Sequence, residues 1–241
     1  MNSPLPRRAL AEFLGSAFLA ATVIGSGIAA ARLSPGDTGL QLFENAAATA
    51  TGLFTFILMF GPISGAHFNP VVSLVDVALG GRRPRDLLAY IPAQITGCIA
   101  GAVVANAMFG LSAISISTTH RASGPHLFAE VIATLGLLLV IFSLARTHRG
   151  QIAPAAVGAY IGAAYFFTSS TSFANPAIDI GRIFSDTFAG IAPASVPSFI
   201  AFQLIGGLVA LALIAILYPD LSAEEASEIM VPQSGAQPDR G

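Results

Sequence analysis

The chain has 241 residues, of which 54% are hydrophobic and 10% are charged, and its formal net charge is −2. An ordinary soluble domain carries roughly 25% charged residues, so this composition excludes a soluble globular protein and indicates one embedded in a membrane. The net charge itself says nothing about partners; for a membrane-embedded chain we expect the lipid bilayer as a partner and no nucleic acid.

Apolar stretches of about 20 residues, the length that crosses a bilayer, predict six membrane-spanning helices. They cover residues 9–31, 45–63, 87–110, 127–145, 152–168 and 197–218. Two further apolar stretches, 70–79 and 176–190, begin with Asn-Pro and are too short to cross. They are predicted to be half-helices that enter the membrane and leave on the same side. The first span is too long for a signal peptide and is expected to be retained.

Basic residues alternate between the two sides of this topology. One side carries Arg7, Arg8, Arg82, Arg83, Arg85, Arg146 and Arg149, and the other carries Arg32, Arg121 and Arg182. The side that is richer in arginine next to the spans is expected to face the cytoplasm. The sequence therefore predicts a multi-pass protein of the inner (plasma) membrane with both termini cytoplasmic.

The two halves of the chain resemble each other. AEFLG at 11–15 matches AEVIA at 129–133, Asn-Pro recurs at 69 and 175, and AQITGCIAGA at 93–102 matches FQLIGGLVAL at 202–211. The offsets are 130 − 12 = 118, 175 − 69 = 106 and 203 − 94 = 109. Because each half holds three spans, the second half must be inverted relative to the first.

The predicted fold is therefore an all-α membrane protein with six transmembrane helices and two re-entrant half-helices in an inverted 3+3 repeat. A short N-terminus at 1–8 precedes one membrane domain at 9–218, with repeats at about 9–115 and 125–218. The polar, acidic tail at 219–241 is predicted to be disordered and cytoplasmic.

Asparagine is a good helix N-cap and proline is favoured at the first helical position, so each Asn-Pro starts a half-helix. In an inverted repeat the two starts should meet near the membrane midplane. Their dipoles, each about half a positive charge at that end, would repel cations there. The backbone carbonyls of residues 64–67 and 170–173 are expected to line the same path as acceptors for a solute.

These motifs together resemble those of the major intrinsic proteins, the aquaporin and aquaglyceroporin family, over about residues 7–218. The resemblance rests on SGAHFNP at 64–70, the second Asn-Pro-Ala, the paired Ala-Glu motifs and the paired glutamines. It implies one pore per subunit, a homotetramer, no cofactor and no enzymatic activity. The residues that match the two family motifs are Asn69, Pro70, Val71, Asn175, Pro176 and Ala177.

Four positions that build the selectivity filter in this family correspond by spacing to Thr49, Ala163, Ser172 and Ile178. All four are small or aliphatic, and Ile178 stands where the family usually has arginine, which predicts a wide filter. NPAID at 175–179 is similar to the NPARD of glycerol channels. The resemblance is to a bacterial branch linked to arsenite, and implies a passive channel for polyols, metalloid hydroxides and some water; a water-selective aquaporin is the alternative.

Glu12 and Glu130 lie inside predicted spans, at matching places of the two halves. In the family such glutamates accept hydrogen bonds from the loops beside the half-helices, so a scaffolding role is expected. The alternative is a proton relay, which would make the protein a gradient-coupled secondary transporter. An intramembrane hydrolase is a third possibility, but neither HExxH nor GxSxG is present.

The roles of His67, Arg182 and Cys98 are interpreted from the residues around them. His67 is either a packed loop residue or part of the cytoplasmic mouth, and the other histidines lack ligand spacing, so no metal site is expected. Arg182 has Asp179 at i−3 and Asp186 at i+4, which favours a local ion-pair network over a displaced filter arginine. Cys98 is expected to be a small core residue.

Overall fold

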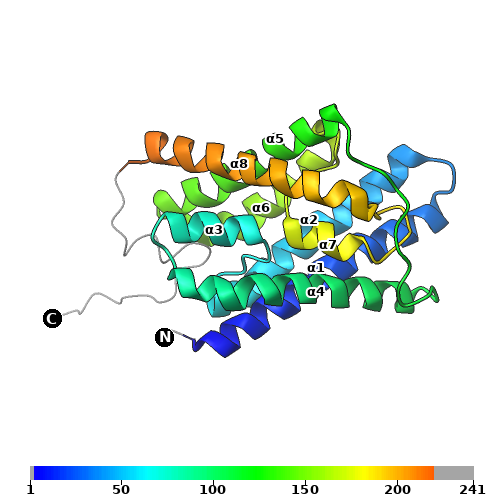
Figure 1. The fold of residues 1–241 in the computed structure, drawn as a ribbon, viewed down its shortest axis with the longest axis horizontal. Coiled ribbons are helices and arrows are strands. Elements are labelled where there is room, and N and C mark those ends of the chain that lie inside the picture. Colours follow the sequence, from blue (N-terminus) through cyan, green and yellow to red (C-terminus); the bar gives the residue numbers. More distant parts are fainter. Residues whose placement is uncertain (1–2, 220–241) are drawn as a thin grey trace.

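The computed structural model describes residues 3–219, so the first two residues and all of the predicted tail at 219–241 except Pro219 lie outside it. Over the described residues it contains eight α-helices and no strand, which confirms the predicted fold class (Figure 1). The helices are α1 (Leu5–Leu33), α2 (Thr38–Ser64), α3 (Pro70–Ala78), α4 (Leu87–Met108), α5 (Gly124–Arg146), α6 (Ala153–Phe167), α7 (Pro176–Arg182) and α8 (Val196–Leu217). Short 3₁₀ turns at Pro84–Asp86, Gly150–Ile152 and Pro193–Ser195 precede α4, α6 and α8.

Five helical segments, α1, α2, α4, α5 and α8, are long and apolar enough to cross a bilayer. The fifth predicted span, 152–168, forms α6, which has 15 residues and is extended at its start by the turn at Gly150–Ile152. The half-helices α3 and α7 have 9 and 7 residues, and the predicted second half-helix at 176–190 is therefore much shorter than expected. Residues 183–192 instead form an irregular segment.

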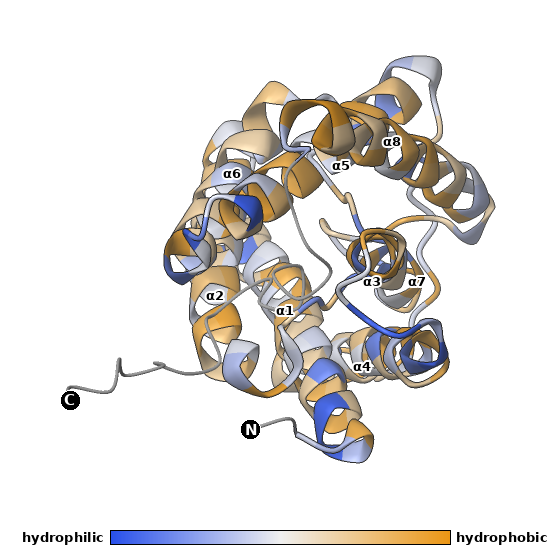
Figure 2. Ribbon diagram, turned by 90° about the vertical axis from the view of Figure 1, so that its left-hand side faces the viewer, coloured by the Kyte–Doolittle hydropathy of each residue, from blue (hydrophilic) through white to orange (hydrophobic). Residues whose placement is uncertain are grey.

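The packing of the helices repeats between the two halves. In the first half α1 packs against α2 and α4, and in the second half α5 packs against α6 and α8. The half-helices contact both halves, since α3 packs on α4 and α8, and so does α7. Figure 1 shows α3 and α7 end to end between α8 and α4, and Figure 2, which is turned by 90°, shows α7 behind α3.

Glycines allow the closest of these contacts. A Cβ atom on Gly97 of α4 would collide with the carbonyl oxygen of Phe13 in α1, and one on Gly101 would collide with that of Ala17. In the second half, a Cβ on Gly206 of α8 would lie 2.6 Å from the carbonyl oxygen of Val131 in α5. Small residues let helix backbones approach in a membrane, where no hydrophobic effect drives the helices together.

The distribution of polarity is that of a protein solvated by lipid. Large apolar side chains are exposed, among them Leu88 at 82% and Ile216 at 71%, and the outer helices are mostly apolar in Figure 2. Polar side chains such as Glu12 and Glu130 are fully buried. The fold is thus that of a multi-pass membrane protein whose buried polar side chains lie inside an otherwise apolar core.

Candidate functional site: a cavity at the junction of the half-helices

Two asparagines join the starts of the half-helices at the centre of the molecule. The Oδ1 atom of Asn69 accepts from the N–H of Val71 at 2.9 Å, and that of Asn175 accepts from Ala177 at 3.0 Å, so each caps its own helix. Each side-chain amide also crosses to the other half. The Nδ2 atom of Asn69 donates to the carbonyl of Ala174 at 2.7 Å, and that of Asn175 donates to the carbonyl of Phe68 at 2.8 Å.

These two crossed hydrogen bonds determine how many N–H donors the asparagine side chains have left for a solute. A side-chain amide carries two N–H donors, and here one of the two is held by a backbone carbonyl of the opposite loop. One N–H on each asparagine remains for a solute. Because α3 and α7 begin at the same place, the positive ends of both helix dipoles also converge there.

The loops before the two asparagines share an unusual backbone. Ala66 and Phe68 have φ of 51° and 49°, and Ser172 and Ala174 have φ of 53° and 49°. The two pairs are related by the same offset as the asparagines, since 172 − 66 = 106 and 174 − 68 = 106. Left-handed conformations of residues other than glycine cost on the order of 1–3 kcal/mol each, so other contacts must hold them.

Those contacts come from the two buried glutamates. The carboxylate of Glu12 accepts from the backbone N–H groups of His67 at 3.0 Å and Phe68 at 2.7 Å, and from the side chains of Ser64 and Gln94. Glu130 accepts from the N–H groups of Phe173 at 3.0 Å and Ala174 at 2.8 Å, and from Gln203 at 2.6 Å. Neither glutamate lines the central cavity. The scaffolding interpretation requires contacts of this kind. A carboxylate that couples transport to a proton gradient would need access to the transport path, and neither glutamate has this access through the cavity.

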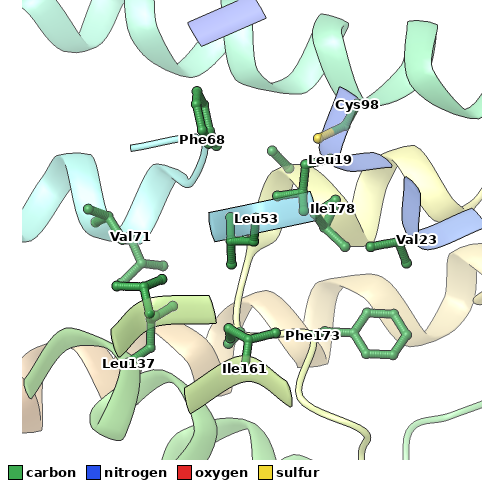
Figure 3. Packing of buried hydrophobic residues seen from close by; sticks show 14 of the residues in the cluster. Leu19, Val23, Leu53, Phe68, Val71, Cys98, Leu137, Ile161, Phe173 and Ile178 are labelled. Carbon is green, nitrogen blue, oxygen red and sulfur yellow. The ribbon is translucent and has the colours of Figure 1, made fainter. Parts of the chain in front are cut away.

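A cavity of about 50 Å³ lies next to the asparagine pair and is lined by both asparagines. A site needs roughly 10–15 Å³ to hold a water molecule, so the cavity has room for a few small molecules in line. One side is apolar and comes from α1, α2, α5 and α6; its residues are Leu19, Val23, Leu53, Ile57, Leu137, Ile141, Val157 and Ile161, several of which are labelled in Figure 3. The other side includes Asn69, Asn175, the loops at 66–68 and 172–174, and the half-helix residues Val72 and Ile178.

Comparison with known proteins gives the family. The family model described as "Major intrinsic protein" matches residues 2–186. The chain belongs to the major intrinsic protein family. Members of this family are channels, so this major intrinsic protein is a membrane channel for small neutral solutes and not an enzyme.

Individual relatives agree with the family. The chain is 45% identical to the aquaglyceroporin AqpS of Rhizobium meliloti (strain 1021) over 209 residues, which cover 87% of this chain and 89% of that protein. It is 31% identical to Aquaporin Z of Brucella melitensis biotype 1 over 196 residues, or 74% of this chain and 85% of that one. Among solved structures, the X-ray structure of the aquaglyceroporin from Plasmodium falciparum matches with a TM-score of 0.69 at 22% identity, covering 90% of this chain and 98% of that chain. This last likeness concerns the fold.

Three of the four residues assigned to the filter line the cavity of this major intrinsic protein. Thr49, Ser172 and Ile178 are among its lining residues, but Ala163 is exposed and is not. On α6 the lining residues on either side of it are Ile161 and Tyr165, and the hydroxyl of Tyr165 lies 3.1 Å from the Oγ1 atom of Thr49. Counting from the second motif therefore misplaced the α6 position, and the lining includes an aromatic side chain that the sequence did not predict.

Arg182 also lines the cavity, contrary to the expected ion-pair network. Among residues 3–219 the ion pairs do not include it. The helix α7 ends at Arg182, so Asp186 is not one helical turn away; its carboxylate accepts from Thr118 instead. Asp179 is fully buried one turn before Arg182 and makes no ion pair with it. The lining thus contains an arginine, although Ile178 stands at the family position.

At the other mouth His67 lines the cavity and belongs to a charged cluster. Its Nδ1 atom lies 3.0 Å from the hydroxyl of Ser73, and its Nε2 atom lies 3.4 Å from the carboxylate of Asp76. That carboxylate also pairs with the guanidinium of Arg82 at 3.1 Å. Sequence reasoning did not assign Asp76 or Arg82, although an acidic residue inside a short apolar half-helix is a signal that could have found the first.

Two further expectations from the sequence can be placed. The carbonyl of Ser64 is not available to a solute, because it accepts from the hydroxyl of Tyr90 at 2.7 Å and from Arg82. Cys98 is fully buried in α4, where a small core residue was expected. Within residues 3–219 no group of three or more histidine, cysteine, aspartate or glutamate side chains is arranged to hold a metal ion.

Proposed function

We propose that the protein is a passive, bidirectional channel for glycerol-like polyols and neutral metalloid hydroxides such as arsenite trihydroxide, with water as a lesser permeant. The observation that carries this proposal is the two-sided cavity at the asparagine pair. A polyol has a hydrocarbon edge and an edge of hydroxyl groups. The apolar side of the cavity can contact the hydrocarbon edge, and the asparagine amides and loop backbone can form hydrogen bonds with the hydroxyl groups.

The physical reason is the cost of dehydration. A hydroxyl group that leaves water without a new hydrogen-bond partner loses roughly 2–7 kcal/mol, so a narrow path must supply partners along its length. Here the asparagine amides and the loop backbone lie on one side, while Leu53, Ile141 and Ile161 lie on another, where Thr49 and Tyr165 add two hydroxyl groups. An ion would need polar partners all around it, and the leucine and isoleucine side chains cannot supply them. The name of AqpS, an aquaglyceroporin, supports the same class of solute.

A water-selective channel is the second candidate, because two lining residues are larger than the sequence predicted. Tyr165 and Arg182 both line the cavity and reduce its width. The ratio of glycerol to water permeability distinguishes the two candidates, since narrowing affects the larger solute first.

For the whole protein we propose a homotetramer in the inner (plasma) membrane with both termini in the cytoplasm. The arginine-rich loops next to the spans support this orientation. The exposed apolar side chains, such as Leu88 and Leu208, support burial in lipid or against other subunits. In this orientation Arg82 lies at the cytoplasmic mouth and Arg182 at the outer mouth.

The test is stopped-flow light scattering of proteoliposomes that contain the purified protein, with water, glycerol, urea and arsenite as permeants. Protein-free liposomes and the variant Leu88→Ala, whose side chain is 82% exposed on the outer surface, are the controls. We expect glycerol and arsenite fluxes well above those of protein-free liposomes, and equal in the variant. Water flux without glycerol flux would overturn the proposal in favour of a water channel, and flux that follows an imposed proton or sodium gradient would overturn it in favour of a transporter.

A further inference from the structure

We propose that Arg182 supplies the fixed positive charge of the outer constriction, in place of the arginine that the family has at the position of Ile178. This inference rests on the proposed channel function and concerns how the same path excludes cations and large solutes. Three features of the Arg182 side chain support the inference: its position between two cavities, the contacts that fix its orientation, and its unpaired charge.

The place of Arg182 is a boundary between two cavities. It lines the inner cavity at the asparagine pair and also a second, outer cavity of about 190 Å³. The outer cavity is lined by Thr38, Leu42, Asn45, Arg121, Thr171, Arg182 and Phe188. Among residues 3–219 Arg182 is the one lining residue that both cavities share. A solute that moves between them must pass its side chain.

Helix geometry explains how an arginine four residues later can serve the same path. Residues four apart lie on the same face of an α-helix, about 6 Å apart along its axis. Ile178 and Arg182 both line the inner cavity, as this spacing requires. The charge is thus moved about one turn away from the asparagines, toward the wider outer cavity.

The side chain is held in one orientation. Its guanidinium carbon lies 3.5 Å from the centre of the Phe173 ring, and its Nε atom donates to the carbonyl of Ala189. Stacking on an aromatic face and the bond from Nε restrain the plane of the guanidinium group. The four N–H groups on its two terminal nitrogens are not engaged by either contact. They are available to a hydroxyl group or a water molecule at the boundary.

The charge of Arg182 is not neutralised by an ion pair, unlike the charge at the other mouth. The repeat offset of 106 places Asp76 at the position equivalent to Arg182, since 182 − 76 = 106. At its own mouth Asp76 pairs with Arg82. At the mouth of Arg182 the other charged side chain that lines the outer cavity is Arg121, which also lies over the Phe173 ring and donates to the carbonyls of Phe188 and Gly190. The carboxylates of Asp179 and Glu130 are buried nearby but line neither cavity. Two arginines therefore make this mouth repel cations.

The principal test replaces Arg182 with glutamine and measures proton and sodium leak together with the glycerol-to-water permeability ratio. Arg32→Gln is the matched control, because it removes the same charge from an exposed residue at the same side of the molecule. We expect Arg182→Gln to raise the cation leak roughly tenfold or more and to raise the glycerol-to-water ratio, while the control keeps wild-type values. Leak and ratio equal to wild type in a folded Arg182→Gln protein would overturn the inference.

Two further variants keep the inference testable if Arg182→Gln does not fold. Thr171→Asp retains the arginine and adds a carboxylate to the outer cavity; Thr171 has φ of 63°, a conformation that aspartate tolerates. It should raise the cation leak, and an unchanged leak would count against the inference. In the double variant Ile178→Arg/Arg182→Gln the charge returns one turn inward, so cation exclusion should be restored.

The outcomes separate this inference from the proposed function. If the wild-type protein conducts water but neither glycerol nor arsenite, the proposed solute class fails, and the leak measurements still test Arg182. If the wild type conducts glycerol and Arg182→Gln changes neither leak nor selectivity, the channel function stands and the role given to Arg182 fails.

Discussion

Replacing Glu12 with glutamine tests the idea that the buried carboxylates hold the strained loops. In the structure one carboxylate oxygen accepts from Ser64 and the N–H of His67, and the other accepts from the N–H of Phe68 and from Gln94. An amide can accept at only one of these two positions. The side chains of Ser64 and Gln94 can reorient, but in either orientation one backbone N–H loses its acceptor.

The magnitude follows from these four hydrogen bonds. An unsatisfied buried donor costs roughly 1–3 kcal/mol, and each of the remaining three bonds loses roughly 1 kcal/mol when its acceptor becomes neutral. The amide is easier to bury than the carboxylate, which offsets part of this loss. We therefore expect a net loss of roughly 2–4 kcal/mol in the free energy of unfolding, a large share of the roughly 5–15 kcal/mol of a typical protein.

Thermal unfolding of the purified protein in detergent measures this loss. For a chain of this size 1 kcal/mol corresponds to about 2–4 °C, so Glu12→Gln should lower the melting temperature by at least about 4 °C. Glu44→Gln is the control, because its carboxylate accepts one hydrogen bond, from the hydroxyl of Ser34, and it should shift the melting temperature by less. A Glu12→Gln protein that melts with the wild type, or that gains pH-dependent flux, would refute the scaffolding role.

Three other substitutions test the centre, the packing and the filter. Asn175→Ala removes a cap and a cross-half hydrogen bond, so it should cost roughly 1 kcal/mol for the cap and weaken cation exclusion; melting and proton-leak measurements check both. Gly97→Leu should separate α1 from α4, because a side chain there collides with the carbonyl of Phe13, whereas Gly124→Ala, with open space around it, should melt close to wild type. Ile178→Arg should reduce glycerol and arsenite permeability more than water permeability, and unchanged ratios would show that Ile178 does not face the path.

The helices of the fold could be predicted because apolar length and the Asn-Pro motif can both be read from short stretches of sequence. The length of the apolar stretches predicted the long helices. The Asn-Pro motif predicted the starts of α3 and α7, where proline occupies the first turn and asparagine caps the helix. The inverted arrangement followed from counting three spans in each half. The end of α7 at Arg182 could not be predicted in this way, since residues 183–192 are also largely apolar but form an irregular segment.

The filter was harder to predict because it depends on how a helix is rotated about its axis. The rotation of α6 depends on close packing against α2, as at Gly158, where an added Cβ atom would lie 2.6 Å from the carbonyl oxygen of Ala50. The distance along the chain from Asn175 does not encode this packing. Two residues along a helix turn the side chain by about 200°, so Ala163 points away from the face that carries Ile161 and Tyr165. A two-residue difference therefore exchanges a small exposed side chain for a buried tyrosine.

The crossed hydrogen bonds of the asparagines also constrain the order in which the protein can be completed during synthesis. The side chain of Asn69 donates to the carbonyl of Ala174, a residue made 105 positions later. Until the ribosome has passed that point, the first half-helix has its cap but lacks its central partner, and the neighbouring helix α8 does not yet exist. We therefore expect nascent chains that end before α7 to insert α1, α2 and α4 while leaving the loop at 64–69 open to proteases. The path through the membrane would then form late, in one step, when the second half closes over the first.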